Sequence, residues 1–175
     1  QLGDLKKINI DKIKGTFVSP IKWKRKFINN SKACIGVSGR LFRNVKNVES
    51  PEWLKQRLTA IGLRSISTLV DITNYITFDL GRPLHVYDAD KINGNLCMRF
   101  AKNGEKCKTL DEKEYQLSDN MIVISDDKLL HGIGGVMGGF DSGCSMETKN
   151  VFLEVALFDP ISVTKTGRKL NLQSD

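Results

Sequence analysis

The feature that most constrains the fold is Val70–Asp88, where an apolar stretch ends abruptly at glycine and proline. Apolar residues at three-to-four spacing predict a helix over about 67–80. Gly81 stands where a C-terminal cap belongs, and Pro83 follows it as a stop. The chain must then turn back, and Leu84–Tyr87 is expected to be extended.

This corner is expected to bring Asn74 and His85 together, although eleven positions separate them. Thr73 precedes Asn74, and His85 is one of two histidines in the chain. Polar groups with different hydrogen-bonding abilities at an element junction suit a small-substrate pocket. The residues alone leave open a blander interpretation, in which the histidine is satisfied in a turn and the other two lie on a helix surface.

The remaining pattern predicts an α+β domain with mixed or antiparallel sheets and a few flanking helices, because helices come early and strands dominate later. Ser50 as N-cap and Pro51 at the first position predict another helix, which Gly62 ends. Asp159-Pro160 predicts a last helix to about 169. Extended segments are expected at 33–48, 96–101, 107–110, 114–117, 121–125, 129–136 and 151–157.

The net charge of +7 is concentrated near the N-terminus. Residues 1–50 carry twelve basic and three acidic side chains, whereas residues 51–175 carry fifteen and seventeen. Lysines and an arginine around Trp23 and Phe27 suit a phosphate backbone, but the sequence alone favours a solvated, partly flexible linker. We expect a basic connecting or peripheral segment at 1–33 and one domain at 34–175.

Composition predicts a soluble, intracellular domain without a metal centre. Four widely spaced cysteines form no CxxC pair, so free thiols in a reducing compartment are expected and a zinc site is not. No apolar run approaches the ~20 residues of a membrane helix, and the start lacks a signal-peptide layout. The chain begins with Gln, so we expect a piece of a longer cytoplasmic protein.

Glu154 and a glycine cluster are the remaining candidates. Strand alternation places Glu154 on the same face as Phe152 and Ala156, where a charge is costly unless it is paired. A glutamate on an edge strand that points to water is the alternative. The cluster at 132–139 lets the backbone approach a ligand closely, or simply forms tight turns; it lacks the GK[ST] of a phosphate loop.

Four ordered blocks and an upstream one carry a resemblance to a known family. They include VDITNY, PLHVYD and VFLEVALFDP, and they span Ser50–Ser67, Val70–Lys91, Arg99–Leu117, Gly132–Gly139 and Thr148–Pro160. Together they resemble the central editing domain of the beta subunit of bacterial-type phenylalanyl-tRNA synthetase. The resemblance covers roughly residues 34–175.

This resemblance implies hydrolysis of tyrosine from mischarged tRNA(Phe). In the family pattern, the residue matching Glu154 recognises the tyrosine hydroxyl. His85 would position the ester or the attacking water, or act as a base, and Asn74 and Thr73 would orient the polar end of the amino acid. Further matches are Arg64 for the terminal phosphate or ribose, Gly135 and Gly138 in the pocket wall, and Ser174 in place of a usual threonine.

The resemblance also implies partners. They are tRNA(Phe), tyrosine or tyrosyl-tRNA, and the alpha subunit in a heterotetramer of two alpha and two beta chains. ATP and magnesium are implied for the complete enzyme, and no cofactor is expected within this chain. The chain stops at Asp175, where a family motif begins, so a C-terminally truncated domain is expected. His131 stands where the family carries a small or apolar residue, and we interpret it as incidental. The alternative function is a non-catalytic tRNA-binding or subunit-docking module.

Overall fold

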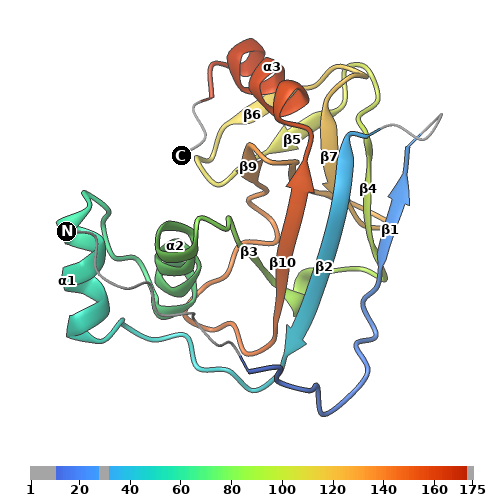
Figure 1. The fold of residues 1–175 in the computed structure, drawn as a ribbon. Helices are drawn as coiled ribbons and strands as arrows, with labels where there is room; N and C mark the ends of the chain where they lie inside the picture. Colours follow the sequence, from blue (N-terminus) through green and yellow to red (C-terminus); the bar gives the residue numbers. More distant parts are fainter. Residues whose placement is uncertain (1–10, 28–31, 173–175) are drawn as a thin grey trace, which may run out of the picture.

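Two β-sheets and a short hairpin organise residues 11–27 and 32–172, the part of the chain that the computed structural model describes (Figure 1). In spatial order, the five-stranded sheet contains β1 (Trp23–Lys26), β4 (Leu96–Phe100), β7 (Ile122–Ser125), β8 (Leu130–Ile133) and β9 (Met137–Gly138). The three-stranded sheet contains β2 (Cys34–Phe42), β10 (Val151–Phe158) and β3 (His85–Asp88). The hairpin pairs β5 (Lys106–Lys108) with β6 (Glu114–Gln116).

Three α-helices in the described ranges lie beside these strands. They are α1 (Glu52–Ala60), α2 (Thr68–Leu80) and α3 (Pro160–Leu170). Figure 1 shows α1 and α2 together on one side and α3 at one end of the sheets. The predicted α+β class is confirmed, since β1 and β4 run parallel and the other strand pairs are antiparallel.

Helix α2 has the bounds that its sequence predicts. It begins after Ser67 and ends at Gly81, whose φ of 61° is the left-handed conformation of a C-terminal cap. The prediction for α1 was wrong at its start, because the residue that precedes the helix is Pro51. The Ser50 hydroxyl instead donates to the buried carboxylate of Asp71 in α2, which ties the two helices together.

The basic N-terminal segment contains a strand that the sequence did not indicate. Trp23–Lys26 forms β1, which pairs in parallel with β4. The Arg25 guanidinium donates to the carbonyls of Cys34 and Ile35, at 3.4 and 3.1 Å, so it is already bound to β2. Tertiary pairing with a neighbouring strand overrides the weak local pattern here.

The core lies between the two sheets and continues beneath the hairpin. One apolar cluster joins both sheets and consists of Cys34, Leu41, Tyr87, Ala89, Leu96, Met98, Ile124 and Phe152. A second cluster under the hairpin consists of Ala101, Cys107, Leu117, Met121, Val123 and Ile133. Strand β7 contributes to both, because its alternate residues face opposite sides and all four are buried.

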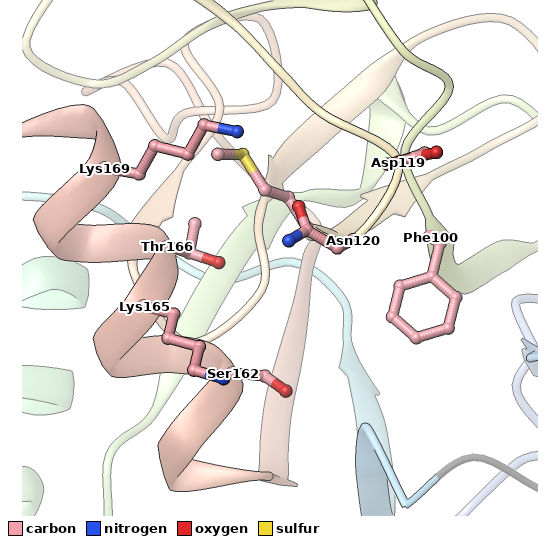
Figure 2. A pocket seen from close by; sticks show the side chains of 8 residues that line it. Phe100, Asp119, Asn120, Ser162, Lys165, Thr166 and Lys169 are labelled. Atoms are coloured by element: carbon pink, nitrogen blue, oxygen red, sulfur yellow. The ribbon is translucent and has the colours of Figure 1, made fainter.

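Helix α3 is a capped amphipathic helix that follows β10 directly. The Asp159 carboxylate accepts a hydrogen bond from the Ser162 amide at 2.8 Å, and Pro160 occupies the first turn, as predicted. One face of α3 lies toward β10. Its other face borders a groove that Phe100 and Asn120 line from the opposite side (Figure 2).

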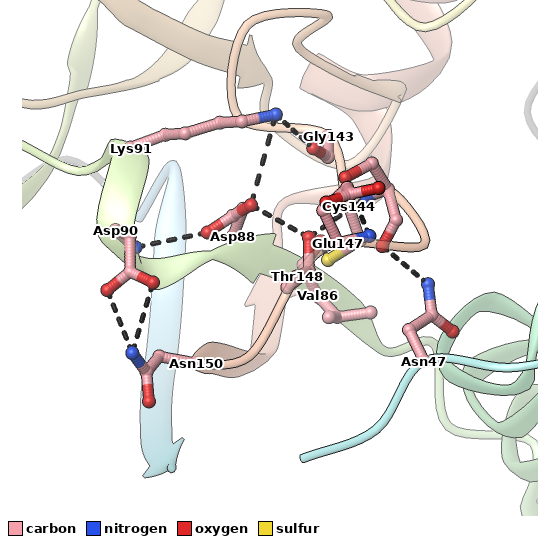
Figure 3. Close-up of polar contacts among 11 residues, drawn as sticks. Asn47, Val86, Asp88, Asp90, Lys91, Gly143, Cys144, Glu147, Thr148 and Asn150 are labelled. Carbon is pink, nitrogen blue, oxygen red and sulfur yellow. Dashed lines mark hydrogen bonds and ion pairs between the residues drawn. The ribbon is translucent and has the colours of Figure 1, made fainter. Parts of the chain in front are cut away.

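A polar network fixes where β10 begins. The Asp88 carboxylate at the end of β3 accepts from the Thr148 hydroxyl at 2.7 Å and lies 3.9 Å from the Lys91 ammonium (Figure 3). Asn150 donates to the Asp90 carboxylate at 3.0 Å. These bonds hold the chain just before β10 against the end of β3. They therefore help to set the register in which β3 and β10 pair.

Candidate functional site

A cavity of about 520 Å³ lies where the end of α2, the glycine loop around β9, strand β10 and the start of α3 meet. A volume in this range is typical of small-ligand sites. Five of the sequence-predicted site residues line it: Asn74, His85, Gly135, Gly138 and Glu154. Asn74 and His85 thus lie on one cavity, as the predicted corner requires.

Strand register explains why His85 and Glu154 face each other. In the antiparallel pair of β3 and β10, Glu154 is opposite His85 and Phe152 is opposite Tyr87. Residues directly opposite in such a pair project from the same face of the sheet. His85, Tyr87 and Glu154 therefore project together toward the cavity.

Glu154 is the buried acid of the site. Its side chain is 3% exposed, and one carboxylate oxygen, Oε2, accepts a short hydrogen bond from the Tyr87 hydroxyl. Burial raises the pKa of Glu154 to about 7, although the bond from Tyr87 acts in the opposite direction. Its carboxyl group therefore changes charge near neutral pH, and its other oxygen has the capacity to accept a ligand hydrogen bond.

His85 is held neutral at physiological pH. Burial, with a smaller contribution from nearby His131, lowers the pKa of His85 to about 4. Its ring contacts the Tyr87 ring edge-on, with centroids 4.4 Å apart and planes at 76°. A neutral imidazole has one donor nitrogen and one acceptor nitrogen, so it is able to orient an ester or a water molecule.

Gly135 and Gly138 are positions where close packing requires glycine. A Cβ built on Gly138 would lie 2.3 Å from Cε1 of His85. A Cβ built on Gly135 would lie 2.7 Å from Cγ2 of Val163, and its φ of 72° also disfavours any side chain. The cavity wall therefore depends on glycine at both positions.

Thr73 and Arg64 lie away from the cavity. The Thr73 hydroxyl donates to the Val70 carbonyl within α2 at 2.7 Å, and Thr73 is not among the described residues that line the cavity. Arg64 is exposed between α1 and α2, and it is also not among the described residues that line the cavity. Ser174 lies outside the described residues.

Sequence reasoning missed three polar side chains of the cavity. Thr77 lines the wall one helical turn after Thr73, and Arg82 lines it from the turn that follows α2. Tyr87 is the third, and it holds Glu154. Alternation in HVYD, which places His85 and Tyr87 on one face, could have revealed it.

His131 belongs to the buried structure behind the site. Its side chain is fully buried, and its Nε2 lies 2.7 Å from the Asp126 carboxylate. Although burial raises the pKa of Asp126, hydrogen bonds from the Asn93, Leu129 and Lys128 amides lower it well below its usual range. The His131 ring also contacts Tyr87, with centroids 6.3 Å apart. It therefore supports the side chain that holds Glu154, rather than being incidental.

The described residues include neither a membrane-spanning helix nor a cluster of metal-ligating side chains. No helix in 11–27 or 32–172 combines the length and apolar character needed to cross a membrane. Within the same ranges, His, Cys, Asp and Glu side chains form no group of three or more able to hold a metal ion.

Comparison with known proteins places this chain in a family. The family model described as B3/4 domain matches residues 33–175, so the chain belongs to the B3/4 domain family. A structural likeness supports the fold alone. The N-terminal fragment of the phenylalanyl-tRNA synthetase beta-subunit from Pyrococcus horikoshii superposes with a TM-score of 0.57, at 14% identity, over 83% of this chain and 45% of that one.

The curated relatives are phenylalanine–tRNA ligase beta subunits. That of Mesorhizobium japonicum is 52% identical over 174 residues, 99% of this chain and 21% of the relative. The beta subunit of Paramagnetospirillum magneticum is 49% identical over 175 residues, which is 99% of this chain and 22% of the relative. The beta subunit of Wolbachia sp. subsp. Brugia malayi is 55% identical over 139 residues, which is 79% of this chain and 18% of the relative. The chain spans about a fifth of the length of these relatives, and the matches confirm the beta-subunit resemblance drawn from the motifs.

Proposed function

We propose that this domain hydrolyses tyrosine from mischarged tRNA(Phe) and that the cavity around Glu154 is its active site. The single observation that carries the proposal is the buried Glu154 carboxyl group, which lies on a ligand-sized cavity opposite a neutral histidine. A buried acceptor of this kind favours a ligand that brings a hydroxyl donor. The relatives, which are beta subunits of phenylalanine–tRNA ligase, supply the class of substrate.

The proposed selectivity follows from hydrogen-bond accounting. An apolar pocket that accepts phenylalanine rejects the added hydroxyl of tyrosine only about 10²-fold. A second site built to bind that hydroxyl discriminates by on the order of 10⁴-fold, because the smaller ligand leaves a buried acceptor unpaired. Tyr87 already donates to one oxygen of Glu154, so the tyrosine hydroxyl would donate to the other.

His85 would orient the reacting groups rather than take up a proton. In the proposed reaction, a water oxygen bonds to the ester carbonyl carbon and the bond to the ribose oxygen breaks. A group whose pKa is about 4 is a weak base near neutral pH, so we assign His85 to orienting the ester or the water by hydrogen bonding. Asn74, which also lines the cavity, would contact the polar end of the amino acid.

The wider assembly is part of the same proposal. An alpha subunit would carry the aminoacylation site in a cytoplasmic enzyme of two alpha and two beta chains. ATP and magnesium would serve that step. Within this domain, Arg64 and Thr73 would reach the substrate only if the tRNA or a neighbouring segment brought them closer, because both lie off the cavity.

Single-turnover hydrolysis of tyrosyl-tRNA(Phe) by this chain tests the proposal. We expect hydrolysis by the unaltered protein, a loss of about 10²-fold in His85→Ala, and partial recovery in His85→Gln, which keeps a hydrogen-bonding group. Asp79→Ala, at an exposed position of α2, is the matched control. RNA binding without any hydrolysis would instead support the tRNA-binding or subunit-docking module.

A further inference from the structure

We propose that the groove along the outer face of α3 binds the phosphate backbone of single-stranded RNA. This α3 groove has a volume of about 500 Å³ and shares no lining residue with the Glu154 cavity. Its walls are Ser162, Lys165, Thr166 and Lys169 of α3, facing Phe100 and Asn120. The inference rests on the proposed function only for the identity of the RNA, since its evidence is the groove itself.

The α3 wall of the groove carries two lysines, Lys165 and Lys169. Lys165 and Lys169 are both exposed and lie four residues apart, which is about 6 Å along the helix axis. Such a pair of like charges repels. In the described structure neither lysine forms an ion pair, and the Lys169 ammonium donates to the Ser118 hydroxyl at 2.7 Å. Two neighbouring phosphates of one strand would neutralise both ammonium groups.

The opposite wall offers a ring and an amide. Phe100 at the end of β4 is half-buried and packs edge-on against Phe27, with centroids 5.3 Å apart and planes at 69°. Asn120 presents both a donor and an acceptor beside it (Figure 2). A basic groove with an aromatic platform and an amide is the combination that single-stranded nucleic acid uses for its phosphates and bases.

One acidic residue determines on which side of the groove the RNA phosphates lie. Asp119 also lines the groove, and Figure 2 shows its carboxylate at the Phe100 end, away from the Lys169 ammonium. It repels phosphate at that end. The phosphates should therefore lie along α3 and the bases should point toward Phe100.

The groove and the cavity lie on opposite faces of one helix. Pro160 and Val163 line the cavity, whereas Ser162 and Lys165 line the groove. A helix with its side chains is only about 10–12 Å across. A strand whose esterified end enters the cavity would thus pass over the start of α3 and lay its preceding nucleotides in the groove.

Fluorescence anisotropy with a short single-stranded RNA that carries no aminoacyl ester tests the inference. Lys165→Ala combined with Lys169→Ala should weaken binding and reduce the magnitude of the log K against log salt slope by about 1.4, the value for two phosphates of a single strand. Lys128→Ala combined with Lys149→Ala removes the same charge from exposed positions outside the groove and should leave the slope nearly unchanged. Equal effects of the two double variants would overturn the inference.

Two single variants test the rest of the groove. Phe100→Leu should weaken RNA binding on the order of tenfold, and Asp119→Asn should strengthen it. A strengthening by Phe100→Leu, or equally tight binding of a duplex, would contradict a single-strand groove. RNA binding that needs the α3 lysines without any tyrosyl-tRNA hydrolysis would keep this inference and remove the proposed function. Hydrolysis of tyrosyl-tRNA together with RNA binding that does not depend on the α3 lysines would keep the proposed function and overturn this inference.

Discussion

Replacement of Glu154 by glutamine should change how the stability of the domain depends on pH. The carboxyl group is 3% exposed, and burial raises its pKa from 4.5 to about 7. A raised pKa means that the folded protein binds the proton more tightly than the unfolded chain does. The free energy of unfolding therefore falls as pH rises from about 4.5 to about 7, and the loss is complete above that range.

The size of the effect follows from the shift. About 2.5 pKa units at 1.36 kcal/mol each give on the order of 3 kcal/mol. Glutamine does not ionise, and its amide oxygen still accepts from Tyr87. Glu154→Gln should therefore gain about 3 kcal/mol relative to the unaltered protein between about pH 4.5 and pH 7.5. His85 titrates in both proteins and its contribution cancels in the difference.

Urea unfolding of both proteins across this pH range measures the difference, provided that each unfolds in a single transition. A stability difference that stays constant with pH would contradict a raised pKa of Glu154. It would mean that the Glu154 carboxyl group ionises in the folded protein as easily as in water.

Three further predictions follow from the same geometry. Gly138→Ala should slow hydrolysis about 10²-fold, because its Cβ would overlap an imidazole ring of the cavity, whereas Gly36→Ala, with no atom within 4 Å, should leave the rate unchanged in the same assay. Asp71→Ala should lower the free energy of unfolding by about 2–4 kcal/mol, against less than about 0.5 for the exposed Asp79→Ala, in urea titrations. Discrimination of tyrosyl-tRNA from phenylalanyl-tRNA should increase as pH rises through about 7, where Glu154 ionises, and a flat profile of rate ratios would count against this.

Local rules predicted the elements whose ends are set by their own residues. Gly81 and Pro83 bounded α2, Asp159 and Pro160 began α3, and alternation in β10 placed Glu154 on the same face as Phe152. Each of these depends on neighbours a few positions away. The sequence therefore specifies them without knowledge of the rest of the chain.

Contacts between residues far apart in the chain were not predicted from the sequence. The Ser50 hydroxyl donates to Asp71 rather than capping its own helix. Tyr87 reaches Glu154 across 67 positions. Such contacts arise from strand register and packing, which no local pattern encodes.

The proposed selection of tyrosine by Glu154 is measured by the ratio of hydrolysis rates for tyrosyl-tRNA(Phe) and phenylalanyl-tRNA(Phe). This ratio should be determined for the unaltered chain and for Glu154→Ala at a pH above 7. We expect a large preference for tyrosine that falls toward unity in the variant, since an apolar wall distinguishes one hydroxyl only weakly. An unchanged preference in a folded Glu154→Ala protein would contradict this selection by Glu154.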